Sequence, residues 1–217
     1  ALGDALAYLE ELVRTELPAG AVVDYKGESL EYQEAGGSVV FTFLLALLVV
    51  YLVMAAQFES FLHPVVILFT VPLALIGGLG GLLLFDQTLN IYSQVGLIML
   101  VGLATKNGIL IVEFINQKRD EGMAFSEAVL VGASRRLRPI LMTAFTTVMG
   151  AVPLVLSGGP GHEARTVIGV VVMCGVAVGT LITLFLIPMA YAAFAKGSAS
   201  PLAVARQLDA ELGEMGG

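Results

Sequence analysis

The chain has 217 residues, of which 57% are hydrophobic and only 13% charged, and its net charge is −7. Because soluble domains carry roughly 25% charged residues, this composition excludes a soluble globular enzyme and a disordered chain. The negative charge argues against nucleic acid as a partner. The single cysteine, Cys174, excludes a disulfide framework and a cysteine-based metal cluster. A polytopic membrane protein is the class that remains.

The first 36 residues differ from the rest because they are rich in acidic side chains. Apolar residues recur at helical spacing from Leu2 to Leu17, and Pro18 ends that predicted helix. Residues 22–25 predict a short strand. Since one helix and one strand cannot bury a core, we interpret residues 1–36 as the α+β end of a larger extramembrane domain. The alternative is a small processed protein with an N-terminal arm.

Five apolar stretches follow, each long enough for a helix that crosses the hydrocarbon layer of a membrane. The expected fold is therefore an all-α polytopic membrane domain over about residues 37–195. The predicted spans are about 39–57, 64–85, 91–115, 137–157 and 166–194. We also expect a cytoplasmic surface helix at about 124–134 and a cytoplasmic tail over 196–217.

Basic residues gather between the third and fourth predicted spans, from Lys118 to Arg138. The positive-inside rule places this segment and the C-terminus in the cytoplasm, and the N-terminal segment on the opposite side. His63 and His162 lie at span edges, and we expect neither of them to carry function.

Lys106 is the residue that most needs an explanation, because it lies well inside the third predicted span. A lysine in mid-membrane costs at least ~2.5 kcal/mol on insertion scales. No acidic residue lies inside the other predicted spans, and Glu113, on the same helix, is ~10 Å away by helical rise. We therefore expect a carboxylate partner from a segment outside this chain. The alternative is that Lys106 donates to backbone carbonyls at a helix break.

Two stretches carry a resemblance to a known family. They are QVGLIMLVGLATKNGILIVEF (94–114) and RRLRPILMTAFTTVMGAVPLV (135–155). Both resemble the proton-driven exporters of the resistance–nodulation–division (RND) superfamily, and more narrowly its hydrophobe/amphiphile efflux branch, which is AcrB-like. The resemblance spans about residues 1–195. It implies that the five spans are the last five of a twelve-helix domain, and that residues 1–36 close a periplasmic porter subdomain.

The resemblance also implies roles for single residues. Lys106 matches the family's relay lysine, Thr143 the relay threonine on the following helix, and Arg136 an arginine on the cytoplasmic side of the same path. Asn107 matches the motif beside the lysine, although as a buried amide it could equally serve helix packing. In the family, two aspartates of the N-terminal half complete the proton relay, and this chain has no counterpart for them.

The implied function is export of drugs or other amphiphilic compounds by proton antiport in the bacterial inner membrane. We expect the isolated chain to be incomplete and inactive. The resemblance implies a homotrimer with a periplasmic adaptor and an outer-membrane channel, surrounded by membrane lipid. We expect no enzyme activity and no cofactor, because the proton-motive force supplies the energy. Two alternatives stay open: a metal-ion exporter of the same superfamily, and a non-transporting membrane scaffold or helper subunit.

Overall fold

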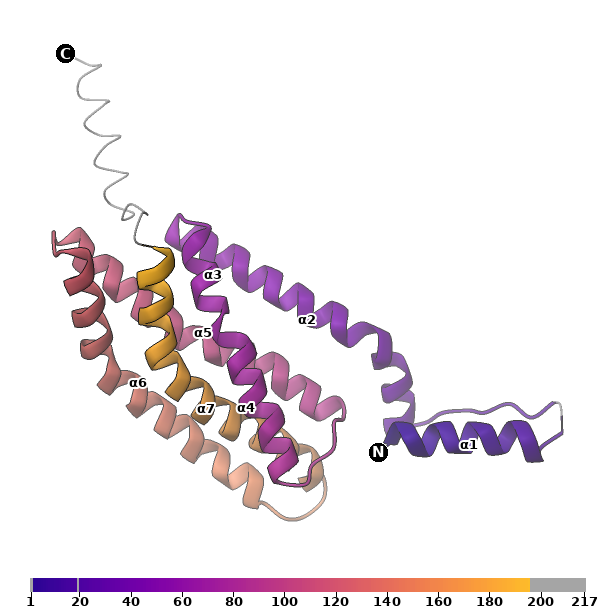
Figure 1. The fold of residues 1–217 in the computed structure, drawn as a ribbon. Coiled ribbons are helices and arrows are strands. Elements are labelled where there is room, and N and C mark those ends of the chain that lie inside the picture. The colour runs from indigo at the N-terminus through magenta and orange to yellow at the C-terminus, as the bar shows by residue number, and fades with distance from the viewer. Residues whose placement is uncertain (1, 19, 196–217) are drawn as a thin grey trace, which may run out of the picture.

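The computed structural model describes residues 2–18 and 20–195, and almost all of these residues are helical (Figure 1). The described helices are α1 (Leu2–Glu16), α2 (Glu28–Phe58), α3 (Leu62–Leu68), α4 (Thr70–Leu84), α5 (Ile91–Asp120), α6 (Phe125–Leu156) and α7 (His162–Phe194). The predicted tail over 196–217 lies outside the described residues, so it stays a prediction.

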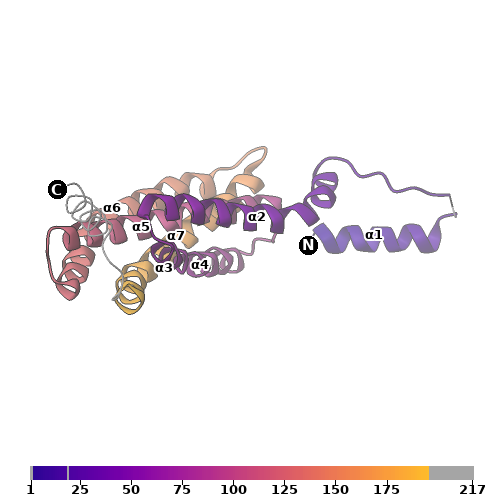
Figure 2. The same ribbon diagram turned by 90° about the horizontal axis from the view of Figure 1, so that it is seen from above.

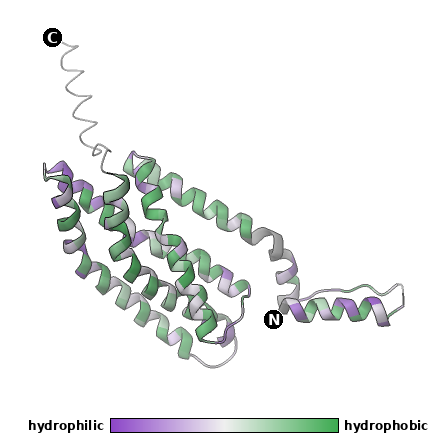
Figure 3. Ribbon diagram, viewed as in Figure 1, coloured by the Kyte–Doolittle hydropathy of each residue, from purple (hydrophilic) through white to green (hydrophobic). Residues whose placement is uncertain are grey.

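The five predicted membrane spans are confirmed as helices long and apolar enough to cross a membrane. They are Val40–Phe58, Leu62–Leu84, Ile91–Asp120, Phe125–Leu156 and His162–Phe194. The second of them consists of α3 and α4, which meet at Phe69. Figure 3 shows that hydrophobic residues dominate these helices, whereas hydrophobic and hydrophilic residues are mixed along α1. The expected all-α membrane fold is therefore present.

The predicted strand at residues 22–25 is wrong, because residues 21–26 form an irregular extended segment instead. A strand needs a neighbour that pairs with its backbone groups, and no strand lies among the described residues. The segment instead returns along α1, where the Tyr25 hydroxyl donates to the Glu10 carboxylate. This hydrogen bond is the main reason that the pKa of Tyr25 is raised above its ordinary value.

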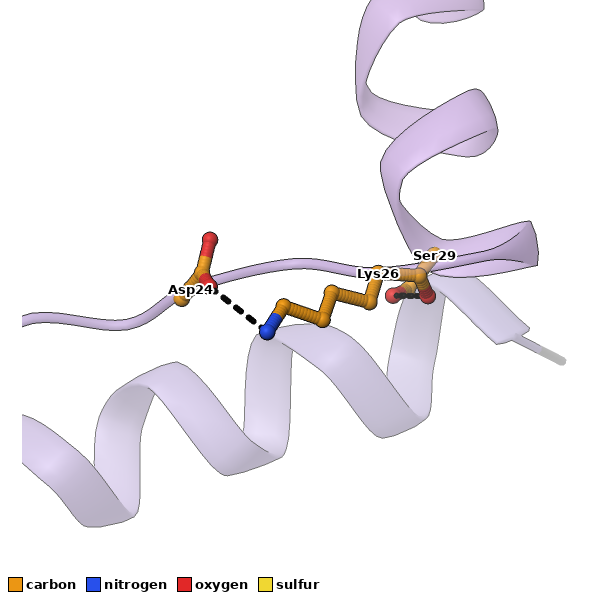
Figure 4. A network of polar contacts seen from close by, with 3 residues as sticks. All are labelled: Asp24, Lys26 and Ser29. Atoms are coloured by element: carbon orange, nitrogen blue, oxygen red, sulfur yellow. Dashed lines mark hydrogen bonds and ion pairs between the residues drawn. The ribbon is translucent and has the colours of Figure 1, made fainter.

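A polar turn leads from this segment into α2 (Figure 4). Lys26 Nζ reaches back to Asp24 Oδ2 at 3.5 Å, and the Ser29 hydroxyl donates to the Lys26 carbonyl at 2.8 Å. Both charged side chains are exposed, so this ion pair adds little stability. Gly27 adopts a positive φ of 62°, which suits glycine and lets the chain change direction.

The structure also differs from the prediction of a separate surface helix at 124–134. That segment and the fourth span form one continuous helix, α6. Figure 2 shows that the early turns of α6 lie at an angle to the later ones. Pro139 lies inside the helix and lacks an N–H for the backbone ladder, but α6 continues through it.

Helix α7 occupies the centre of the bundle, where it packs against α4, α5 and α6 (Figures 1 and 2). Small residues allow the close approach of α4 and α7: a Cβ added at Gly81 would lie 2.5 Å from Cys174 Cβ. Within its most apolar stretch, α7 buries 44% of its residues, whereas α2 buries only 6%. The bundle core is therefore built by α3 to α7, with α2 at its edge.

Candidate functional site: a polar pocket between α5, α6 and α7

A small pocket opens between the middles of α5, α6 and α7, and three of the four predicted site residues line it, two from α5 and one from α6. Its lining residues are Leu103, Lys106, Asn107, Thr143, Ala144, Thr147 and Val176. Its volume is about 20 Å³, which is enough for one water molecule. A lysine, an amide and two hydroxyls thus line one pocket.

Lys106 lies on the exposed side of α5. Among the described residues it has no ion pair and no hydrogen bond. The spans contain no carboxylate that reaches it, which agrees with the sequence prediction that the partner comes from elsewhere. The alternative, donation to backbone carbonyls at a break in α5, finds no support, because α5 is continuous from Ile91 to Asp120.

Thr143 places its hydroxyl at the pocket from α6. Its Oγ1 donates to the Ile140 carbonyl at 3.1 Å, so the hydroxyl proton is engaged within the helix while the oxygen can still accept. Thr147, one turn further on, lines the same pocket and donates to the Thr143 carbonyl at 2.8 Å. The sequence analysis missed Thr147, although its i,i+4 spacing from Thr143 was the available signal.

Asn107 also lines the pocket, but its amide nitrogen donates a hydrogen bond to a residue that does not line it. Its side chain is only 6% exposed, and Nδ2 donates to Thr180 Oγ1 of α7 at 3.0 Å. This bond ties α5 to α7. The sequence left two roles open for Asn107, a part in the proton relay and helix packing. This hydrogen bond is a contact of the packing kind.

Arg136 does not line the pocket. It lies seven residues before Thr143 on α6, or ~10.5 Å along the helix. Its guanidinium carbon lies 4.6 Å from the centroid of the Phe114 ring on α5. The structure therefore places Lys106, Asn107 and Thr143 together and sets Arg136 apart from them.

A second polar cluster surrounds Tyr191, which is fully buried. Its hydroxyl donates to Asn116 Oδ1 and accepts from Arg119 Nη1, the latter at 2.7 Å. His63 stacks on the Tyr191 ring with centroids 5.5 Å apart, and Phe125 stacks on it at 5.9 Å. His63, expected to be incidental, is thus a core residue. The sequence analysis missed this Tyr191 cluster, whose partners lie far apart in sequence.

The comparisons with known proteins agree with this architecture. A family model described as the AcrB/AcrD/AcrF family matches residues 1–195. Over 196 residues the chain is 43% identical to an uncharacterized transporter of Haemophilus influenzae, covering 87% of this chain and 19% of that protein. A crystal structure of a heavy metal efflux pump matches with a TM-score of 0.75 and 31% identity, covering 90% of this chain and 20% of that one.

Five apolar helices and these matches define the class as a multi-pass membrane transporter of the RND superfamily. Within that class, the chain belongs to the AcrB/AcrD/AcrF family. The predicted resemblance to RND transporters is thereby confirmed at the level of the family. The chain spans about a fifth of the length of the relatives it matches, so the activity and partners of the whole protein belong to the proposal below.

Proposed function

We propose that this chain forms part of a proton-driven exporter, and that Lys106 and Thr143 belong to its proton-coupling site. The single observation that carries this proposal is the shared pocket, which is lined both by a lysine in the middle of α5 and by a hydroxyl of α6. Ionisable groups inside a membrane are costly and commonly mark ion or proton pathways. Lys106 has no acidic partner among the described residues, which supports a carboxylate from outside this chain.

The coupling follows from the chemistry of such a pair. A charged carboxylate attracts the Lys106 ammonium, and protonation of that carboxylate removes the attraction. The Thr143 oxygen can then accept a hydrogen bond from the released ammonium, directly or through one water in the pocket. Because the two residues lie on different helices, the exchange of partners biases the position of α5 against α6. A helix pair with two arrangements can convert proton entry into movement.

We propose drugs or other amphiphilic compounds as the exported substrates, in a homotrimer of the bacterial inner membrane that works with a periplasmic adaptor and an outer-membrane channel. In this arrangement residues 1–36 lie in the periplasm and the C-terminus lies in the cytoplasm, as the basic residues between the third and fourth spans favour. The Lys106-Asn107 motif favours this branch of the superfamily. Among the described residues, no group of His, Cys, Asp and Glu could hold a metal ion. We propose no cofactor and no enzymatic step.

Metal-ion export is the second candidate function. The specific observation that favours it is the match to the heavy metal efflux pump, at 31% identity over 90% of this chain. Both candidates use the same coupling site, so a variant of the site tests the coupling role and the compound tested identifies the substrate.

The test is Lys106→Ala in the native gene, with Arg165→Ala as the matched control. Arg165 is a basic residue at the exposed start of α7, where it donates to the Pro160 carbonyl, outside the pocket. We expect Lys106→Ala to abolish tolerance to dyes and drugs at normal expression, and Arg165→Ala to preserve it. Loss of zinc or copper tolerance alone would establish the metal exporter, and unchanged tolerance to both would overturn the coupling role.

A further inference from the structure

Besides the pocket, a contact between Arg136 of α6 and Phe114 of α5 joins these two helices. The guanidinium carbon of Arg136 lies 4.6 Å from the centroid of the Phe114 ring. This distance is well inside the range of about 6 Å in which a cation is attracted to the face of an aromatic ring. The contact crosses the same helix interface that forms the pocket.

The Phe114–Arg136 contact lies at about the same distance from the pocket along α5 as along α6. Phe114 lies eight residues after Lys106 on α5, which is ~12 Å, and Arg136 lies seven residues before Thr143 on α6, which is ~10.5 Å. Since α5 and α6 are joined by a short connection and run in opposite directions (Figure 1), the two contacts form two levels of one interface. A further contact keeps the helices close: a Cβ added at Gly132 would lie 2.5 Å from Ile115 Cγ1.

The ring is the contact that holds the Arg136 side chain. Its Nε is buried and has no hydrogen-bond partner among the described residues. A long arginine side chain near the end of a span otherwise extends toward lipid headgroups. Lys118 also lies near the Phe114 ring, with Nζ 5.5 Å from the centroid, but Glu121 already binds that ammonium at 2.5 Å. The lysine therefore has its own partner, whereas Arg136 depends on the ring.

We propose that Phe114 is a positioning residue, which holds the Arg136 guanidinium at the α5–α6 interface at a fixed distance from the Lys106–Thr143 pocket. The inference rests on the proposed function and extends it by one residue. Phe114 does not line the pocket, so it acts on the site through Arg136. Because the attraction comes from the electron-rich face of the ring, it depends on the electronics of the ring as well as on its size.

The test replaces Phe114 in the full-length transporter by phenylalanine analogues with one, two and three ring fluorines. Fluorine withdraws electrons from the ring face and changes the size of the ring little. The readout is transport of a fluorescent dye driven by a pH gradient in proteoliposomes, or of zinc if the tolerance test identifies a metal exporter. We expect the rate to fall stepwise with fluorine number, to about a tenth for the full loss of the contact, and Phe114→Trp to retain it. The same analogues at Phe145, which is exposed on α6, should have no effect.

A second arm of the experiment uses Arg136→Gln. In that background fluorination of Phe114 should change nothing further, because the two residues act as one unit. A flat response to fluorination in the wild-type background overturns the proposal and leaves a ring that acts by size alone. Lys106→Ala, measured alongside, separates the two ideas: if that variant still couples transport to the pH gradient, the proposed function itself fails.

Discussion

Two cations on the same helix, Lys106 and Arg119 of α5, have opposite surroundings. Arg119 donates to the buried Tyr191 hydroxyl, and its guanidinium lies 5.2 Å from the Phe125 ring centroid. Lys106 is exposed and has no ion pair or hydrogen bond among the described residues. A cation that its own chain surrounds with partners stabilises the packing of helices, whereas one without them indicates a partner from elsewhere.

The Tyr191 cluster, which binds Arg119, also differs from the pocket that Lys106 lines. The Tyr191 cluster is a closed stack of rings from α3, α6 and α7, tied to α5 by two hydrogen bonds. The Lys106 pocket is small, polar and open to one side of the bundle. We therefore expect substitutions in the Tyr191 cluster to change stability, and substitutions at Lys106 to change coupling.

The largest expected effect on stability is that of Tyr191→Ala. It removes a fully buried ring, two stacking contacts and the hydroxyl between Asn116 and Arg119. Truncation of a buried aromatic side chain costs about 3–5 kcal/mol in the free energy of unfolding. Thermal unfolding of the purified protein in detergent measures the loss.

Tyr191→Phe is the control, because it keeps the ring and removes only the hydroxyl. We expect it to lie between wild type and Tyr191→Ala in stability. An unchanged melting temperature for Tyr191→Ala would show that the Tyr191 cluster does not hold the helices together.

A smaller effect is expected from Gly81→Ala. A Cβ at this position would lie 2.5 Å from Cys174 Cβ, so α4 and α7 would have to separate. Overpacking of this kind costs about 1–3 kcal/mol in the free energy of unfolding. The neighbouring Gly80→Ala provides the control, since nothing lies within 4 Å of an added Cβ there. Equal melting temperatures for the two variants would contradict the close α4–α7 contact.

The smallest effect concerns the bond from Asn107 to Thr180. A double-mutant cycle with Asn107→Ala and Thr180→Val isolates the coupling between them. Hydrogen bonds between membrane helices average about 0.6 kcal/mol, and we expect a coupling energy of that size. Asn107→Ala should leave the pH dependence of transport unchanged. A shifted pH profile would instead place Asn107 in the proton path.

Much of the fold follows from the sequence, because a membrane span is determined by its own length and apolarity. The five spans needed no knowledge of packing, and Lys106 was identified by its cost in mid-membrane alone. The prediction of a strand at residues 22–25 failed, since a strand depends on pairing with a neighbouring strand and none lies among the described residues. Likewise, only the observed backbone shows that α6 continues through Pro139.

The site was predictable only in part, for a related physical reason. Neutral polar residues such as Thr180 and Asn116 cost little in a helix, so the sequence does not mark them. Their partners come from helices far away in the chain, and packing alone decides which residues meet. The contact between Phe114 and Arg136 was missed for the second of these reasons: the sequence analysis singled out Arg136, but only packing shows that its partner is Phe114.

The most direct test of the central claim compares Lys106→Ala with wild type in proteoliposomes, using the full-length transporter and an imposed pH gradient. We predict that the variant is expressed and folded at the wild-type level, because within the described residues Lys106 makes no ion pair or hydrogen bond that holds two helices together. We also predict that it shows no transport driven by the gradient. Gradient-driven transport at the wild-type rate would contradict the assignment of Lys106 to the proton-coupling site.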